Sequence, residues 1–366
     1  MSIIDWIKFY RYNPFALEVA VRNTWKQRIG RDLLGVGVLG CGGGGLMHTS
    51  HYLWHLETDV RAIFDINGRR FADLDARFPY MRRDIQRTTD FREVLARTDI
   101  DIISVCTPDY SHADYVIAAL EAGKHVLCEK PMCTTLEDCE RIIRAAEKAS
   151  GVFVVFQQMR FVPRNAAVKK LIDQGKLGEV FYIETGYIHD MRDRATQFSQ
   201  WRMDPERLQH PIFGGCHHID LLRWLGGEVE EVYTVSSHKS LPSYPADDTY
   251  ATVLRLAGGA VGYVLTCFGP RVPREFHPLR VYGTRGSIHN TLLFQNAKND
   301  VTEKKLNVLE YRGVPDFRAQ ISHFVDCVRG RTQPMVTARE GARTVAACWA
   351  AIESGTKGRP VAVPRI

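Results

Sequence analysis

Short apolar runs alternate with amphipathic stretches along the first half of the chain. Apolar runs of strand length predict strands at residues 35–39, 60–64, 102–106, 125–128 and 152–156. Apolar residues at helical spacing predict helices between them at 46–56, 69–77, 115–121 and 136–149. Because strands that alternate with helices build parallel sheets, this half is predicted to form a doubly wound α/β domain.

The second half is richer in predicted strands, several of them separated by turn signals such as Gly258-Gly259. The predicted strands are 180–187, 229–236, 249–256, 260–267 and 279–282. Helices are predicted at 321–328 and 338–353, and the second of these is expected to pack back on the first domain. No linker rich in Pro, Gly or Ser separates the halves, so the two domains are predicted to join tightly near residue 157.

Length and charge narrow the class of protein. A chain of 366 residues is long for one core and suits two domains. Its 48 Lys and Arg exceed its 42 Asp and Glu, which gives a net charge of +6 without any run of five basic residues. This mild excess suits an anionic ligand such as a dinucleotide, or an ordinary surface, and gives no support for nucleic-acid binding.

The nine cysteines are scattered and include no CxxC pair. Their odd number and apolar surroundings predict reduced thiols in a cytoplasmic protein, with neither a disulfide framework nor a metal site. No apolar run approaches the roughly 18 residues that predict a transmembrane helix. The first 32 residues lack the pattern of a secretory leader and include a predicted helix at 16–28. This segment is expected to pack against the body of the protein or a partner subunit, with membrane-surface contact the lesser alternative.

The first predicted strand turns into its helix through the sequence GCGGGG. Gly40, Gly42 and Gly45 match the pattern G-x-G-x-x-G, whose glycines permit a tight turn, close approach of a pyrophosphate and tight packing of helix on strand. Asp65 ends the second predicted strand twenty residues after Gly45, at the spacing where a carboxylate binds the adenosine ribose. The sequence therefore predicts a dinucleotide site.

The residues around Asp65 bear on which dinucleotide binds. Asp65 repels a 2′-phosphate and favours NAD. Arg69 and Arg70 follow closely, where they could receive the 2′-phosphate of NADP or lie solvated on the next helix. NAD is the predicted cofactor, and NADP stays open as the alternative.

Two segments are predicted to end at the carboxyl edge of the sheet, where open α/β sheets bind their ligands. They are SVCTPDYSH, residues 104–112, and HVLCEKPM, residues 125–132. Lys130 follows its strand with no intervening turn residue, which brings it to the nicotinamide end of the site. Like charge from a cationic nicotinamide favours the neutral lysine, which suits Lys130 to proton transfer. The residues predicted to contact the dinucleotide are Gly40, Gly42, Gly43, Gly44, Gly45, Asp65, Asn67, Arg69, Arg70, Thr107, Pro108, His112, Glu129, Lys130 and Pro131.

The stretch FGGCHHIDLLRWLGG, residues 213–227, places two histidines at the start of an apolar helix. Gly214 and Gly215 leave room ahead of His217. Asp220 lies three residues further on, shares a helix face with His217 and could orient its ring. His218 points about 100° away on a helix and is predicted to be structural or to lie at a domain contact.

These motifs, in this order, resemble those of the Gfo/Idh/MocA oxidoreductases. They are GCGGGG, TPDYSH, CEKP, MRFVP and GGCHHIDLLRWLGG, followed by VYGTRGSI at 281–288 and GRPVAVP at 358–364. The resemblance implies an extension at 1–32, a Rossmann domain at 33–157, and at 158–366 an α/β domain for substrate binding and oligomerisation. The second domain would be built on a large, mainly antiparallel open sheet, commonly used for homodimer or homotetramer contacts. The implied activity is NAD(P)-dependent hydride transfer on sugars, cyclitols or related polyols.

The resemblance assigns proton transfer to Lys130 and His217. In the better-known sugar and inositol dehydrogenases the second motif reads D-x-x-x-H, whereas this chain has Phe213 four residues before His217. The departure makes the pocket less polar and leaves open which of the two residues is the base. The residues predicted to contact substrate are Arg160, Tyr187, His189, Trp201, Arg202, Phe213 and His217, each of which also suits a core or salt-bridge position.

Two other functions stay open at this point. One is a glycoside hydrolase that retains NAD and works through transient oxidation, a chemistry known among relatives of the family. The other is a non-catalytic cofactor-binding partner protein, which the loss of the carboxylate at Phe213 suggests. Retention of Lys130 and His217 argues against the partner protein, whereas the hydrolase begins with the same oxidation as a dehydrogenase.

Overall fold

The chain divides into two compact units. The computed structural model describes residues 18, 21–22, 32–79, 81–82, 84–191, 200–202, 204, 210–272, 277–297, 300–305 and 317–366. Unit 1 comprises Met1–Met132, Arg141–Phe156 and Phe317–Ala338, and unit 2 comprises Cys133–Glu140, Gln157–Asp316 and Arg339–Ile366. The main change of unit lies next to the junction predicted near residue 157. Residues 133–140 precede this junction but belong to unit 2, and residues 317–338 follow it but belong to unit 1. The sequence pattern did not predict either assignment.

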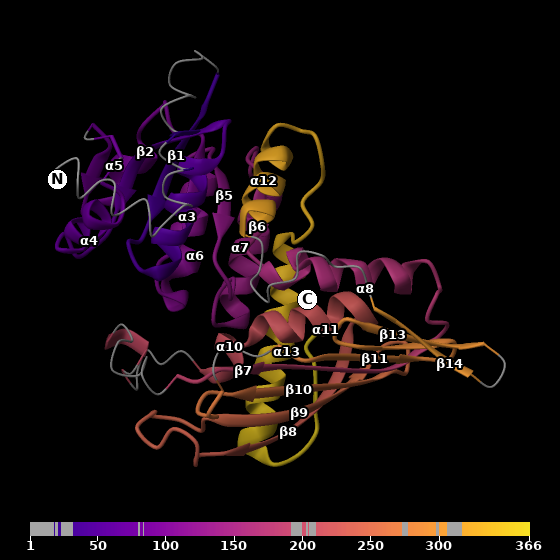
Figure 1. Cartoon of the computed structure of the whole chain (residues 1–366). Helices are drawn as coiled ribbons and strands as arrows, with labels where there is room; N and C mark the ends of the chain where they lie inside the picture. The colour runs from indigo at the N-terminus through magenta and orange to yellow at the C-terminus, as the bar shows by residue number, and fades with distance from the viewer. Residues whose placement is uncertain are drawn as a thin grey trace. The chain divides into compact units, whose positions relative to one another are not determined.

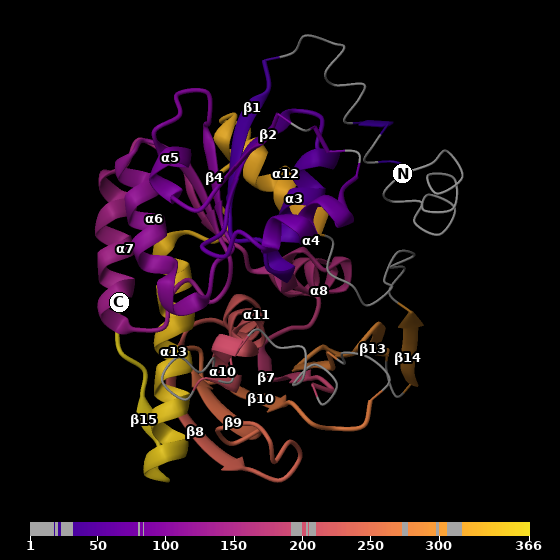
Figure 2. The same ribbon diagram turned by 90° about the vertical axis from the view of Figure 1, so that its left-hand side faces the viewer.

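Unit 1 contains a six-stranded parallel sheet in the order β3-β2-β1-β4-β5-β6. Its strands are β1 (Leu34–Leu39), β2 (Thr58–Phe64), β3 (Gln86–Thr88), β4 (Ile102–Val105), β5 (His125–Cys128) and β6 (Phe153–Val155). The accompanying helices are α3 (Gly43–Trp54), α4 (Arg70–Arg77), α5 (Phe91–Leu95), η1 (Asp109–Ser111), α6 (His112–Glu121), α7 (Leu136–Lys148) and α12 (Phe317–Val328). Figure 2 shows α3 and α12 on one side of the sheet and α5, α6 and α7 on the other. This strand order confirms the predicted doubly wound Rossmann fold.

The C-terminal helix that joins the core of unit 1 is α12. Ile321 and Phe324 of α12 are fully buried in the same apolar cluster as Val36 of β1 and Ile102 of β4. The following helix, α13 (Ala338–Lys357), belongs to unit 2 except for its first residue. The helix predicted to return to the first domain is this later one, and the indole N–H of its Trp349 donates to the carbonyl oxygen of Thr134 (2.7 Å), a residue of the predicted range 33–157 that also belongs to unit 2. The apolar face of α12 therefore packs into the core of the Rossmann domain.

Part of the N-terminal extension lies on α3. Of the predicted helix at 16–28, the structure describes Glu18, Val21 and Arg22, all helical, and the rest falls outside the described residues. The indole N–H of Trp54 donates to Glu18 Oε1 (2.8 Å), and the guanidinium carbons of Arg22 and Arg318 lie 4.4 and 5.0 Å from the centroid of the Trp54 ring. These contacts support packing of the extension on the body of unit 1.

Unit 2 contains a nine-stranded sheet in the order β14-β13-β12-β11-β7-β10-β9-β8-β15. Its strands are β7 (Val180–Ile188), β8 (Val229–Ser237), β9 (Thr249–Leu256), β10 (Val261–Cys267), β11 (Leu279–Gly283), β12 (Gly286–His289), β13 (Leu292–Ala297), β14 (Asp300–Lys305) and β15 (Val361–Ala362). Its helices are η2 (Gln158–Phe161), α8 (Pro163–Asp173), η3 (Gln200–Arg202), α10 (Pro211–Gly214), α11 (Cys216–Gly226) and α13. Within the described part of this sheet β7 and β10 pair in parallel and the other neighbouring strands pair antiparallel, which confirms the predicted open and mainly antiparallel sheet.

Helix α11 covers one face of this sheet (Figure 1). A Cβ atom at Gly262 of β10 would lie 2.7 Å from the Leu222 side chain, and one at Gly226 would lie 2.6 Å from Ile183 of β7, so helix and strands pack closely. Strand residues that point to the opposite face leave large apolar side chains exposed: Phe181, Tyr233, Val235, Val253 and Val261. Among the described helices, none is both long and apolar enough to span a membrane.

Candidate active site

The glycine-rich turn of unit 1 has the shape that the motif requires. Gly40 has a φ of +103°, and a Cβ atom there would lie 2.6 Å from the carbonyl oxygen of Cys106. A Cβ atom at Gly45 would lie 1.7 Å from the carbonyl oxygen of Gly40. At Gly42 and Gly43 a Cβ atom would meet nothing within 4 Å, so the start of α3 faces open space. Close packing on one side and open backbone on the other fit the pyrophosphate of a dinucleotide.

Asp65 lies against this turn. Its Oδ2 accepts the backbone N–H of Cys41 (2.8 Å) and its Oδ1 accepts that of Asn67 (2.8 Å). A carboxylate has about four acceptor sites, so it can still bind the hydroxyls of a ribose. Arg69 and Arg70 are exposed, and Arg70 lies 3.6 Å from Asp73. The described residues therefore fit an adenosine ribose at Asp65.

His112 joins the two loops at the carboxyl edge of the sheet. Its Nδ1 lies 2.8 Å from the carbonyl oxygen of Pro131, and its Nε2 lies 2.9 Å from that of Thr107. The peptide bond between Lys130 and Pro131 is cis. The ring of His112 is buried, and its two contacts link the loop at Thr107-Pro108 to the E-K-P segment.

A buried histidine that the sequence analysis did not single out supports Glu129. His48 of α3 contacts Ser104 Oγ through Nδ1 (2.6 Å) and Glu129 Oε1 through Nε2 (3.2 Å). Glu129 Oε2 accepts the backbone N–H of Lys130 (3.0 Å). Burial opposes ionisation of Glu129, but the hydrogen bond from His48 and the positive charge of Lys130 outweigh it and hold the pKa of Glu129 below its ordinary value. The helix after the glycine turn is thus linked to the predicted catalytic lysine.

In unit 2, the start of α11 brings His217 into a cluster of aromatic and imidazole rings. Tyr187 of β7 lies edge-on to His217, with 5.0 Å between the ring centroids, and its hydroxyl lies 2.9 Å from His189 Nδ1. His218 contacts Thr185 Oγ1 through Nδ1 (2.7 Å). The structure therefore brings together three residues predicted to contact substrate: Tyr187, His189 and His217.

Arg160 and Asp220 lie together elsewhere in unit 2. Arg160 donates from Nε and Nη2 to the two carboxylate oxygens of Asp220, both at 2.8 Å, and from Nη2 to Glu340 (3.1 Å). The hydroxyl of Thr344 donates to Asp220 Oδ1 (3.1 Å). Arg160 is 4% exposed and Asp220 fully buried. These contacts favour the salt-bridge interpretation of Arg160 over substrate binding, and they engage Asp220 with Arg160 rather than with the ring that it was predicted to orient.

Two family models match the chain. Residues 34–157 match the model GFO_IDH_MocA, an oxidoreductase family with an NAD-binding Rossmann fold. Residues 169–363 match GFO_IDH_MocA_C, the C-terminal alpha/beta domain of the oxidoreductase family. The chain belongs to the Gfo/Idh/MocA oxidoreductases.

Several relatives of this chain are named for activity on sugars or cyclitols. Levoglucosan dehydrogenase of Pseudarthrobacter phenanthrenivorans is 28% identical over 291 residues, which cover 70% of this chain and 73% of the relative. The scyllo-inositol 2-dehydrogenase (NAD(+)) of Bacillus subtilis is 30% identical over 293 residues, which cover 74% of this chain and 79% of the relative. The solved structure of levoglucosan dehydrogenase in complex with NADH and levoglucosan has a TM-score of 0.75 at 25% identity, covering 91% of this chain and 100% of that one.

Three other residues predicted for the site of this Gfo/Idh/MocA protein, Phe213, Trp201 and Arg202, make contacts with aromatic rings. Phe213 of α10 is buried, and its ring and that of Trp349 of α13 form a T-shaped pair with 6.5 Å between centroids. The Arg202 guanidinium lies 4.4 Å from the centroid of the Trp201 ring. His277 was missed, because a single histidine 59 residues after His218 gives no signal in a sequence. In the folded chain Nδ1 of His277 lies 2.7 Å from Nε2 of His218.

Proposed function

We propose that this protein is an NAD-dependent oxidoreductase that transfers a hydride between a secondary hydroxyl or keto group of a sugar, cyclitol or related polyol and the nicotinamide. The observation that carries the proposal is the glycine turn with Asp65 beside it, in a chain that matches both domains of the family. Both relatives described above are named dehydrogenases, so we favour dehydrogenation over NAD-retaining glycoside hydrolysis or cofactor binding alone.

NAD is the proposed cofactor, in preference to NADP. The carboxylate of Asp65 is fixed against the turn by two backbone N–H groups and would oppose a 2′-phosphate. Arg69 and Arg70 project into solvent and are the residues that would favour NADP if the preference were reversed. The proposed dinucleotide contacts are the glycines of the turn, Asp65 and Asn67, and the loops that contain Thr107, Pro108, His112, Glu129, Lys130 and Pro131.

Lys130 and His217 are the residues that we propose for proton transfer. Bound NAD⁺ supplies the hydride acceptor. Oxidation of a secondary alcohol also requires a group that accepts the hydroxyl proton as the hydride leaves the same carbon. A lysine amine and an imidazole can each hold that proton, and the two can share it in sequence. Tyr187, His189, Trp201, Arg202 and Phe213 are proposed to contact the substrate.

We further propose that the protein forms a homodimer or homotetramer in the cytoplasm. The large apolar side chains exposed on the open face of the nine-stranded sheet support an oligomer, because exposed apolar surface of this kind often meets a partner. All nine cysteines are free thiols, which supports a reducing compartment.

A substrate panel tests the proposed activity. The purified protein is incubated, with and without added NAD⁺, with a series of sugars, cyclitols and glycosides that includes levoglucosan and scyllo-inositol, and NADH formation is followed by absorbance and glycoside cleavage by product analysis. NAD⁺-dependent turnover of a polyol supports the proposal. Cleavage of a glycoside without added cofactor would indicate the hydrolase instead, and silence with every substrate despite NAD binding would indicate the partner protein.

A further inference from the structure

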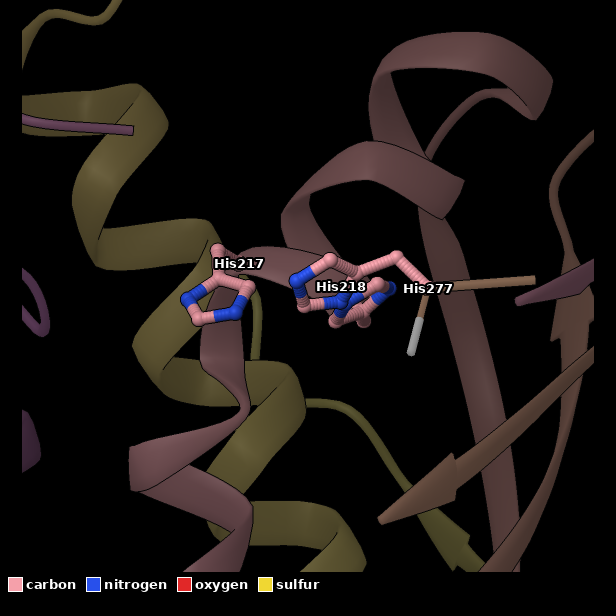
Figure 3. A group of neighbouring side chains, drawn as sticks. All are labelled: His217, His218 and His277. Atoms are coloured by element: carbon pink, nitrogen blue, oxygen red, sulfur yellow. The ribbon is translucent and has the colours of Figure 1, made fainter. Parts of the chain in front are cut away.

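Three histidines meet in the interior of unit 2: His217, His218 and His277 (Figure 3). His217 and His218 lie in the first turn of α11, and His277 precedes β11. All three are buried, with exposures of 1%, 0% and 6%. One ring nitrogen from each lies within 4.8 Å of those of the other two. This density of imidazole nitrogens is typical of a site for a transition-metal ion.

The orientation of His218 is that of a metal ligand. Its Nδ1 lies 2.7 Å from Thr185 Oγ1, and its Nε2 lies 2.7 Å from His277 Nδ1. If Nδ1–H donates to Thr185, then the lone pair of Nε2 accepts the Nδ1–H of His277, and a metal ion between the two nitrogens would take the place of that proton. Metal-ligating histidines almost always donate their second ring N–H to such an outer partner, which fixes the tautomer and the ring.

The spacing of the rings requires only a small adjustment. Zinc lies about 2.0–2.1 Å from imidazole nitrogens in a tetrahedral site, so two ligating nitrogens lie about 3.4 Å apart. The 2.7 Å between His218 and His277 must therefore open by less than about 1 Å, and the widest separation, at most 4.8 Å, must close by no more than about 1.5 Å. Side-chain rotation supplies movements of this size.

Tyr187 supports two of the rings. It lies edge-on to His217, and it stacks on His277 with 17° between the ring planes. The cluster itself supplies only imidazole nitrogens, which suit Zn²⁺ and its neighbours and not Mg²⁺ or Ca²⁺, because the latter require oxygen ligands. Three protein ligands leave a fourth position of a tetrahedral ion for water or a hydroxyl group.

We propose that His217, His218 and His277 bind a divalent transition-metal ion of the zinc type. The cysteine pattern predicts no metal site. It carries no information on these histidines, of which His277 lies 59 residues after His218 and meets the other two only in the fold. A consequence follows that rests on the proposed function. An ion bound to His217 takes the lone pair that would accept the hydroxyl proton, so zinc inhibits the dehydrogenase.

Zinc binding is measured on the full-length protein after treatment with a chelator and gel filtration. Competition with a chromophoric chelator gives the affinity, elemental analysis gives the stoichiometry, and the visible absorbance of Co²⁺ gives the coordination. We expect a single tight ion per chain with a tetrahedral Co²⁺ spectrum. His277→Gln should remove tight binding, and Thr185→Val, which keeps all three ligands, should weaken it by about 10–100-fold.

His289→Gln is the matched control, since it removes a partly exposed histidine of the same unit that lies outside the cluster. It should leave the zinc affinity unchanged. The site is refuted if the wild-type protein binds no tight ion, or if wild type, Thr185→Val and His289→Gln bind zinc equally well. Thr185→Val keeps this test open should His277→Gln fail to fold.

Kinetics then separate the site from the proposed function. Zinc should inhibit the wild-type enzyme at concentrations that match its measured affinity, and Thr185→Val should need about 10–100-fold more. Full turnover by the zinc-bound enzyme would refute the predicted inhibition. Tight zinc binding by a protein that oxidises no polyol would leave the site standing and refute the proposed function, and turnover without zinc binding would do the reverse.

Discussion

His217 and Lys130 come from different units, and each lies in a different physical environment. His217 is buried among Tyr187 and two other histidines, whereas Lys130 follows β5 beside Glu129. We expect His217→Ala and Lys130→Ala each to lower kcat by about 10²–10⁴-fold, the usual loss when a positioned proton-transfer group is removed. Neither residue is proposed to bind the adenosine half, so NAD affinity should change little.

Steady-state kinetics on chelator-treated protein and fluorescence titration with NADH check this prediction. His289→Ala serves as the control for a histidine lost from the same unit. If either variant retained wild-type kcat, that residue would be removed from the proton-transfer pair.

We expect His48 to act through Glu129 as a positioning residue. His48→Leu removes the hydrogen bond that holds the Glu129 carboxylate ionised, so we expect kcat to fall about tenfold, equivalent to about 1.4 kcal/mol, with a smaller change in the substrate KM. His55→Leu, a change of the same kind at a partly exposed position of unit 1, should have little effect. A uniform rise of KM with unchanged kcat would contradict the positioning role.

The same residue predicts a pH dependence. The pKa of Glu129 is lowered in the folded protein, so its contribution to stability is present at neutral pH and is lost as the pH falls through the folded pKa. In His48→Leu the folded pKa of Glu129 is expected to lie nearer the ordinary value, so less stability is available to lose. Denaturant unfolding at neutral and acidic pH should show a smaller difference for the variant than for the wild type.

We propose that Asp65 decides the choice of cofactor. We expect the wild type to bind NADH more tightly than NADPH. Asp65→Ala should lower the affinity for NADH by tenfold or more, since a hydrogen bond from a ribose hydroxyl to a charged acceptor contributes about 1.5–3 kcal/mol. NADPH binding should improve because a repulsive charge is removed. Fluorescence titration measures both, with Asp73→Ala as a control for an exposed carboxylate. Tighter binding of NADPH by the wild type would show that Arg69 and Arg70 override Asp65.

At the scale of the elements, the described part of the ion network in unit 2 joins η2, α11 and α13 through Arg160, Asp220 and Glu340. Arg160→Met leaves a buried carboxylate without its guanidinium, which should cost about 3–5 kcal/mol of unfolding free energy. Arg280→Met removes a surface partner of Glu184 and should cost about 1 kcal/mol or less. Denaturant unfolding distinguishes the two, and a raised substrate KM in an Arg160→Met protein of unchanged stability would restore the substrate-binding role.

Sequence pattern located the elements well where apolar residues were periodic and poorly where they were not. The strands β5 and β9 and the glycine turn were predicted, because apolar runs and glycine spacing follow directly from burial and backbone freedom. The short β3 and the five-residue α5 were missed, since they contain too few apolar positions to form a pattern. Spacing placed Asp220 and His217 on one helix face, but it could not reveal that Arg160, sixty residues earlier, engages that carboxylate.

For the whole molecule, the exposed face of the nine-stranded sheet is the basis of the last prediction. Tyr233 of β8 pairs with Val253 of β9, which pairs in turn with Tyr263 of β10, so these side chains form a row across the sheet. Val253 is 46% exposed, and a lysine there would place a charge in the middle of the proposed subunit contact. We expect Val253→Lys to shift the protein toward the monomer in light scattering at micromolar concentration. Ile66→Lys, at an exposed position of unit 1, should leave the mass unchanged. A wild-type protein that is already monomeric under these conditions would rule out the oligomer.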